Sequence, residues 1–313
     1  MLLVLANCCF CSHNARALEV MYQVRILPCL DSDELAAQMR SELALRPELA
    51  ESLGRSVVEA IEFGYYLTND GKVEWGEAVR SACESKVSIA SETELPTGGS
   101  LPFAETIVQV SNETTLGASK RLVDGGKRPL ALNFANGSET GGGFLRGATA
   151  QEEALCRSSA LYATLVDDPM YDYHRKHELW AESSDWAILS PNVPVFRDDR
   201  GMELNEPWLL SFITCAAPYA PSVGHPRSKD LLRGRIVRVL SIARAYGYSE
   251  LVLGAWGCGA FENDHRCTAR DFRSAIEGEF AGAFGEVVFA ITDWSPERPF
   301  LGPFRDVFSE ERI

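Results

Sequence analysis

A run of three glycines followed by two adjacent glutamates constrains this 313-residue chain more than any other feature. Residues 141–153 read GGGFLRGATAQEE, and the segment from Thr149 to Glu152 has the spacing of a capping box. The residues that follow keep apolar side chains at helical spacing. We therefore expect a bare glycine loop leading into a helix over residues 150–166, whose free N–H groups and dipole favour an anionic ligand.

The two glutamates differ in the structural task available to them. Glu152 lies three residues after Thr149, so it is expected to close the capping box. Glu153 has no such task, which makes it the better candidate for an acid that exchanges a proton with a ligand lying on the glycines. The alternative is that both acids only favour the helix dipole, an effect of about 0.3–1 kcal/mol each.

Two segments of the chain read as a buried strand followed by glycines and a helix. The first is PLALNF at residues 129–134, which precedes a polar loop containing Asn136 and then the three glycines. The second is ELVL at residues 250–253, which precedes GAWGCGAF at residues 254–261. Neither is a P-loop or a GxGxxG motif, but backbone amides in such turns can wrap a pyrophosphate. Together they favour a split phosphate site, where Trp256 and Phe261 could stack on a ribose or base. Core packing is the alternative for both aromatic residues.

Several blocks of this sequence resemble one family. NFAN at residues 133–136 followed by glycines resembles the signature of macrodomains, which bind ADP-ribose. GGG, seven residues and QEE match the signature of the poly(ADP-ribose) glycohydrolases, and the surrounding blocks look like the compact microbial type. These blocks are VSNETTLGASKRL (110–122), SPNVPVFRDDRG (190–201) and LVLGAWGCGAFENDHR (251–266). The resemblance covers about residue 50 to about residue 295.

The resemblance implies roles for individual residues. Glu153 would be the catalytic acid, and Glu152 would hold the ribose hydroxyls near the scissile bond. Asn136 and the three glycines would contact the distal ribose and phosphate, the loop from Gly257 to Phe261 would hold the diphosphate, and Phe144 would flank the catalytic loop. The candidate substrate-binding residues are Asn136, Gly141, Gly142, Gly143, Phe144, Gln151, Gly254, Trp256, Gly257, Cys258, Gly259, Ala260 and Phe261. The chain departs from the family at residues 138–140 (SET), where a basic or amide residue is common.

The implied activity is hydrolysis of the ribose–ribose O-glycosidic bonds of poly(ADP-ribose), with ADP-ribose as product and reversal of ADP-ribosylation, for example in the DNA damage response, as the outcome. One glutamate can act as acid and then as base on such a bond. Adjacent carboxylates near a diphosphate should raise each other's pKa and keep Glu153 partly protonated. No metal and no nicotinamide or other cofactor is required. A non-catalytic ADP-ribose reader and a hydrolase of mono-ADP-ribosylated protein or nucleic acid remain alternatives.

Composition limits the partners. The net charge is −14 and the pI is near 4.9, which argues against binding of duplex nucleic acid. Poly(ADP-ribose) or ADP-ribosylated protein would be held by local backbone amides, with weak contact to the rest of a polymer. Nine irregularly spaced cysteines favour a reducing interior, cytoplasm or nucleus, and Cys156 and Cys215 read as core thiols. No apolar run reaches the ~18 residues of a membrane span.

The expected architecture is a three-layer α/β macrodomain-like fold, with a mixed sheet flanked by helices and an N-terminal helical extension. The expected parts are an unclassified segment (1–30), where Met21 is a candidate start, the helical extension (31–100) and the catalytic domain (101–313). Strands are expected near residues 105–111, 129–134, 186–190, 209–215, 250–253 and 286–291. Helices are expected near residues 31–63, 115–125, 150–166, 229–246 and 268–280. The tail after Trp294 is expected to pack loosely.

Overall fold

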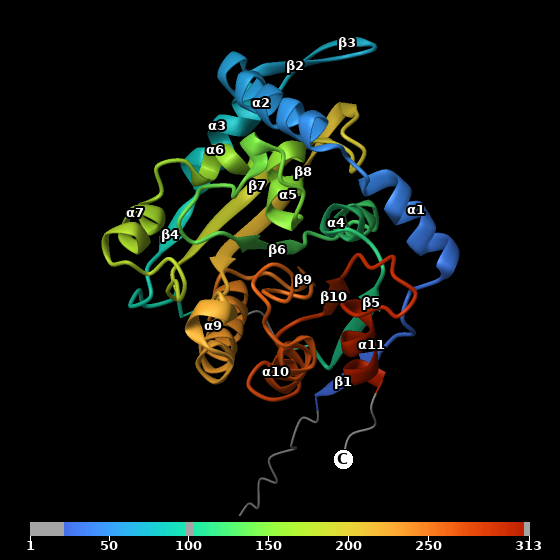
Figure 1. Cartoon of the computed structure of the whole chain (residues 1–313), viewed down its shortest axis with the longest axis vertical. Helices are drawn as coiled ribbons and strands as arrows, with labels where there is room; N and C mark the ends of the chain where they lie inside the picture. The colour runs from blue at the N-terminus through green and yellow to red at the C-terminus, as the bar shows by residue number, and fades with distance from the viewer. Residues whose placement is uncertain (1–21, 98–102, 310–313) are drawn as a thin grey trace, which may run out of the picture.

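The computed structural model describes residues 22–97 and 103–309, and its centre is one mixed sheet with helices against both faces (Figure 1). The eight strands lie in the order β1-β5-β10-β9-β6-β8-β7-β4, and β7 runs antiparallel to both of its neighbours. The strands in this spatial order are β1 (Gln23–Ile26), β5 (Glu105–Ser111), β10 (Glu286–Ala290), β9 (Glu250–Leu253), β6 (Leu130–Ala135), β8 (Glu203–Ala216), β7 (Ala187–Arg197) and β4 (Val87–Ile89).

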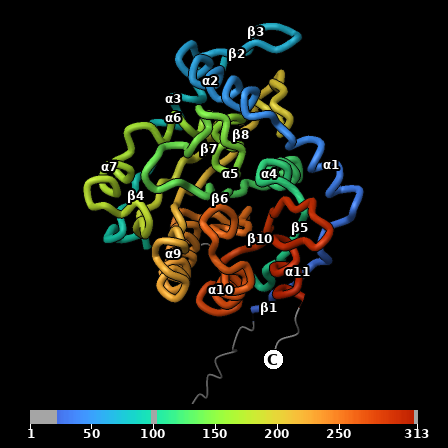
Figure 2. Tube along the Cα trace, viewed as in Figure 1, coloured from blue at the N-terminus to red at the C-terminus, as the bar shows by residue number. Residues whose placement is uncertain are grey.

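The helices and one hairpin surround this sheet, as the chain trace in Figure 2 shows. The main helices are α1 (Asp33–Leu43), α2 (Pro47–Phe63), α3 (Gly76–Ser85), α4 (Thr115–Asp124), α5 (Gln151–Ser158), α6 (Leu161–Leu165), α7 (Pro169–Lys176), α8 (Ala220–Val223), α9 (His225–Ala245), α10 (His265–Glu277) and α11 (Leu301–Ser309). A short 3-10 helix, η1 (Phe144–Arg146), precedes α5, and β2 (Tyr65–Thr68) pairs with β3 (Gly71–Glu74).

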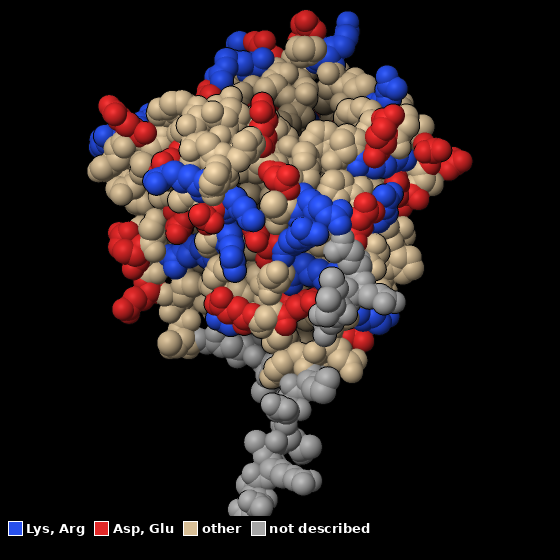
Figure 3. Space-filling view, turned by 60° about the horizontal axis from the view of Figure 1, so that its bottom comes forward, with Lys and Arg blue, Asp and Glu red and all other residues tan. Residues whose placement is uncertain are grey.

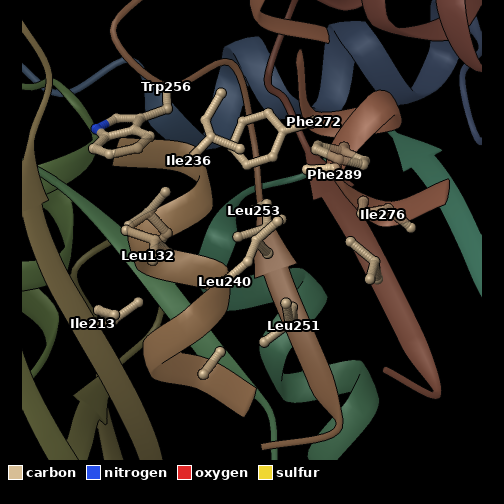
Figure 4. Close-up of a cluster of buried hydrophobic side chains, with 14 of the residues drawn as sticks. Leu132, Ile213, Ile236, Leu240, Leu251, Leu253, Trp256, Phe272, Ile276 and Phe289 are labelled. Atoms are coloured by element: carbon tan, nitrogen blue, oxygen red, sulfur yellow. The ribbon is translucent and has the colours of Figure 1, made fainter. Parts of the chain in front are cut away.

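Two hydrophobic clusters cover the two faces of the sheet. On one face, α9, α10 and α11 pack on the strands, and Figure 4 shows side chains such as Ile236, Leu240 and Phe272 gathered around Leu251 and Leu253 of β9. On the other face, α2 to α7 pack on the same strands, with Phe144, Leu155 and Phe196 in their core. The three-layer α/β arrangement expected from the sequence is therefore confirmed.

The helix expected over residues 150–166 is wrong in its extent. It is divided into α5 and α6 because Ser159 adopts an extended backbone and forms a bridge with Val195 of β7. The Ser159 hydroxyl donates to the carbonyl of Leu155 and accepts from the N–H of Leu161. A serine that bonds nearby backbone groups in this way competes with the regular helical pattern.

The segments near both ends of the described chain are more ordered than the sequence suggested. The boundary at residue 100 stays a prediction, but β1 and β4, which precede it, are strands of the main sheet. The expectation of a loosely packed tail is wrong, because α11 buries Phe304 and Phe308 against Phe289 of β10. Residues 1–21, which include Cys8, Cys9 and Cys11, lie outside the described residues.

The surface of the described chain carries both signs of charge. On the face shown in Figure 3, Lys and Arg side chains are interspersed with Asp and Glu. Within residues 22–97 and 103–309, no helix is both long enough and apolar enough to cross a bilayer. Cys156 and Cys215 are buried free thiols, as expected.

Candidate active site

A cleft of about 390 Å³ opens where β6, β9 and β10 end, and residues of both strand–glycine–helix units border it. The ends of parallel strands are the usual ligand-binding edge of an open α/β sheet. The start of α4, the start of α5 and the α1–α2 connection complete the walls. The sequence candidates that line the cleft are Asn136, Gln151, Glu152, Glu153, Trp256, Gly257, Gly259, Ala260 and Phe261. The other candidates, Gly141, Gly142, Gly143, Phe144, Gly254 and Cys258, do not line it.

Glu153 combines one fixed carboxyl oxygen with one uncommitted oxygen. Its Oε1 accepts a hydrogen bond from the backbone N–H of Gly143 at 2.9 Å. Its Oε2 is buried and has no hydrogen-bond partner among the described residues, although the side chain lines the cleft. A buried polar atom without a partner costs free energy and calls for an explanation. A ligand atom that bonds to Oε2 in the cleft would supply one.

Glu152 is fully engaged with protein groups. Its Oε2 accepts from the backbone N–H of Asn136 at 2.7 Å, and its Oε1 accepts from Nδ2 of Asn133 at 3.2 Å. Burial is the main cause that raises the pKa of Glu152 to about 8; the nearby charge of Glu153 acts in the same direction, and the two hydrogen bonds oppose it. Part of the rise at Glu152 is therefore the expected effect of an adjacent carboxylate.

The predicted capping box does not form. Ala150 is the N-cap residue of α5, and no side chain bonds to the free N–H groups there. The Glu152 carboxyl is directed instead at the end of β6, where buried donors compete for it more effectively than a solvated helix end. The Gln151 side chain also bonds to β6. Its Nε2 donates to the carbonyl of Leu132 and its Oε1 accepts from the N–H of Phe134, which fixes the start of α5 to β6.

The two carboxylates converge on Gly142, which has a left-handed backbone with φ of 60°. A Cβ at this position would lie 2.4 Å from Oε1 of Glu153 and 3.0 Å from Oε2 of Glu152. Such distances are well inside van der Waals contact, so no larger residue fits without moving the acids. The requirement for glycine here comes from the catalytic candidates themselves, whereas the resemblance implied approach of the ligand.

The neighbouring glycines also serve packing within the protein. Gly141 has φ of 71°, and a Cβ there would lie 3.0 Å from the ring of Phe144. Phe144 is fully buried and packs on Tyr162 at 4.7 Å between ring centroids, so it supports the loop from behind. A Cβ on Gly143 would meet Ala148 at 2.9 Å. Close approach of ligand to these glycines stays a prediction.

Asn136 holds the turn between β6 and the glycine loop. Its Oδ1 accepts from the N–H groups of Ser138 and Glu139, and its own N–H binds Glu152. Asn side chains commonly bond the backbone two and three residues ahead in turns. Its Nδ2 bonds to no other group of the described chain and the residue lines the cleft, so the predicted ribose contact stays a prediction.

The second glycine turn separates into residues that support it and residues that face the cleft. A Cβ on Gly257, which has φ of 73°, would meet Ala217 at 2.7 Å and Asn263 at 2.9 Å. A Cβ on Gly259 would meet nothing within 4 Å, so this glycine borders open space. Gly254 is confined by the carbonyl of Ala290, and the thiol of Cys258 is buried.

The two aromatic candidates of this turn also divide into one that packs in the core and one that is partly exposed at the cleft. Trp256 is fully buried in the core near Ile236 of α9 (Figure 4), consistent with the packing alternative. It also forms part of the cleft wall. Phe261 is half-buried, packs edge-on to Tyr219, and lines the cleft. Phe261 is therefore the better candidate for a ligand contact.

The structure adds site residues that the sequence did not reveal. Asn133 is fully buried and joins Glu152 to the hydroxyl of Thr214, its register partner in β8. An amide in the otherwise apolar strand LALNFA was the signal for it. Asp199 receives a hydrogen bond from Thr114, and burial raises its pKa to about 6. Two further residues, Trp294 and Phe300, line the cleft from the segment after β10. In the described chain, no group of three or more His, Cys, Asp or Glu is arranged to hold a metal.

Comparisons with known proteins agree with this geometry. Residues 54–198 match the family model for the microbial-type PARG catalytic domain, where PARG is poly(ADP-ribose) glycohydrolase. The chain is similar to a poly(ADP-ribose) glycohydrolase from Thermomonospora curvata, with 38% identity over 83% of this chain and 99% of that chain and a TM-score of 0.77. The same bacterial enzyme bound to the inhibitor ADP-HPD gives 39% identity over the same shares of the two chains and a TM-score of 0.76.

A solved structure of a second bacterial enzyme extends the likeness. The poly(ADP-ribose) glycohydrolase from Deinococcus radiodurans in complex with ADP-ribose is 37% identical over 73% of this chain and 96% of that chain, with a TM-score of 0.65. None of the curated proteins compared with the chain matches it. The fold described above therefore has counterparts of known structure.

Proposed function

The chain belongs to the microbial-type poly(ADP-ribose) glycohydrolase family, and from this premise we propose that it hydrolyses the ribose–ribose O-glycosidic bonds of poly(ADP-ribose) and releases ADP-ribose. The enzyme class, a glycosidase, follows from the family; the roles of the residues are our proposal. The observation that carries them is the uncommitted Oε2 of Glu153, buried at the wall of the cleft while Gly143 holds Oε1.

In the proposed reaction, the terminal ADP-ribose unit lies in the cleft with its diphosphate over the loop from Gly257 to Phe261. Backbone N–H groups there and the N-terminus of α5 provide local positive potential. This arrangement explains how an acidic protein can hold a dianionic group. Gly259, which borders open space, is the position where the backbone can come closest to the ligand.

Glu153 then donates a proton from Oε2 to the oxygen that leaves with the next unit. Bond cleavage passes through an oxocarbenium-like state, and the resulting carboxylate accepts a proton from the incoming water. The hydrogen bond from Gly143 keeps the carboxyl in one orientation through both steps. Such fixed geometry avoids the loss of rate that follows small displacements of a reacting group.

Glu152 orients the ribose hydroxyls and limits the charge of the pair. Its two oxygens are fixed by Asn136 and Asn133, so its direction is set before substrate binds. With a pKa of about 8 it is mostly protonated at neutral pH, which limits the negative charge near the bound diphosphate.

Incubation of the purified chain with poly(ADP-ribose) of defined length tests this function. We expect free ADP-ribose, identified by mass, to accumulate as the polymer shortens. A parallel incubation with mono-ADP-ribosylated protein tests the alternative substrate. Release of ADP-ribose from the mono-ADP-ribosylated protein, with no shortening of the polymer, would overturn the proposed reaction.

A further inference from the structure

An exposed ion pair brackets the glycine loop beside Glu153. Arg146 donates from Nη1 and Nη2 to the two carboxylate oxygens of Glu139, with 2.7 Å between Nη2 and Oε2. These two residues lie on either side of the three glycines in the sequence. The side chains are 64% and 43% exposed, so the pair is open to solvent and to a ligand outside the cleft.

This pair lies close to the group proposed to protonate the leaving oxygen. Nη2 of Arg146 and Oε1 of Glu153 are 3.7 Å and 3.8 Å from the same point, the place a Cβ on Gly143 would occupy. Glu153 also contributes to the raised pKa of Arg146, after the larger effect of Glu139. Arg157 also interacts electrostatically with Glu153, but it is buried. Arg146 is thus a solvent-accessible cation at the reacting end of the site.

Neither Arg146 nor Glu139 lines the cleft that would hold the terminal ADP-ribose unit. The scissile bond joins the unit in the cleft to the unit that leaves. Groups next to Glu153 but outside the cleft are therefore on the side of the leaving unit. In a polymer the leaving unit carries a diphosphate. A guanidinium binds phosphate oxygens with the same two-pronged geometry that it uses for a carboxylate.

We propose that Arg146 binds a phosphate of the leaving ADP-ribose unit and that Glu139 occupies this guanidinium until substrate arrives. The inference rests on the proposed function. The pair then selects substrates whose leaving group carries phosphate over those whose leaving group does not.

Exchange of the carboxylate for a phosphate is feasible because the loop does not depend on the ion pair. The Glu139 backbone accepts from the N–H of Gly142, and its own N–H donates to Asn136. These main-chain bonds hold the turn when the side chains separate. An exposed ion pair contributes little to stability, so a doubly charged diphosphate can displace the carboxylate.

Two substrates that share the bound unit test the proposal. One is poly(ADP-ribose); the other is an O-glycoside of ADP-ribose with a neutral aryl leaving group. We expect Arg146→Gln to raise KM for the polymer by roughly fivefold and to leave kinetics on the aryl glycoside unchanged. Glu139→Gln should lower KM for the polymer at low ionic strength, and added salt should remove this gain.

Arg25→Gln serves as the matched control, because Arg25 forms a comparable exposed pair with Glu105 on β1 and β5, away from the site. It should leave the kinetics on both substrates unchanged. Equal losses on both substrates in Arg146→Gln and Glu139→Gln would show that the pair only shapes the loop and would overturn the proposal. An unchanged KM for the polymer in Arg146→Gln would do the same. A wild-type protein that leaves the polymer intact would refute the proposed function instead.

Discussion

Replacing Gly142 by alanine adds one methyl group at the point where both acids meet. The new Cβ would lie 2.4 Å from Oε1 of Glu153, about 1 Å inside ordinary van der Waals contact. Since the backbone on either side is fixed, the Glu153 carboxyl must move by a distance of this order and lose its bond to Gly143. Misplacement by about 1 Å at a reacting centre costs roughly 100-fold in rate. We therefore expect Gly142→Ala to lower kcat by about that factor.

The same substitution also carries a backbone cost, because alanine is disfavoured at φ of 60° by about 1–2 kcal/mol. Gly126→Ala isolates this cost, since Gly126 has φ of 79° and a Cβ there meets nothing within 4 Å. Both variants should melt a few degrees below wild type, but Gly126→Ala should keep full activity. The assay is release of ADP-ribose from polymer, followed beside a melting curve. A folded Gly142→Ala protein with near wild-type kcat would refute the argument that this glycine makes room for the acids.

Three further substitutions test other parts of the site. Gly259→Val should leave the melting temperature almost unchanged and weaken ADP-ribose binding at least about tenfold in a calorimetric titration, because its side chain would enter open space at the cleft. Gly257→Val should instead destabilise the protein, since its Cβ meets Ala217 and Asn263; a stable variant with lost binding would contradict this. The pKa of Glu152 rises from 4.5 in the unfolded chain to about 8 on folding, so its contribution to stability is full below pH 4.5 and is lost as pH rises through 8. The melting temperature of Glu152→Gln should therefore gain on that of wild type from pH 5 to pH 8, and parallel curves would show that Glu152 titrates normally.

The features that the sequence predicted well are those encoded by neighbouring residues. The two strand–glycine–helix units were visible because each is contiguous, and both border the same cleft in the structure. Glu152 and Glu153 do differ in their contacts within the protein, but the expected helix cap is not the cause. Glu152 is held by Asn133 and the backbone of Asn136, which are 19 and 16 residues away, and not by a helix cap. A capping box competes poorly when a buried strand end offers donors to the same carboxyl.

Features that depend on distant pairing were not predictable from local pattern. β1 and β4 are too short to show a clear alternation, and they become strands only by pairing with β5 and β7. The break at Ser159 depends on its bridge to Val195, and the contact between Asn133 and Thr214 joins residues 81 apart in the chain. α11 forms because Asp293 accepts from the N–H groups of Phe300 and Leu301 at its start, another contact that composition does not show.

Glu153→Gln tests the central claim most directly, because the amide keeps the size of the side chain and an oxygen for the Gly143 N–H but cannot deliver a proton. The measurement is the rate of ADP-ribose release from poly(ADP-ribose), made beside a titration of the same protein with ADP-ribose. We expect the rate to fall at least about 100-fold, as for loss of an essential acid, while the dissociation constant for ADP-ribose stays within a few fold of wild type. Turnover close to that of wild type would contradict the assignment of Glu153 as the catalytic acid.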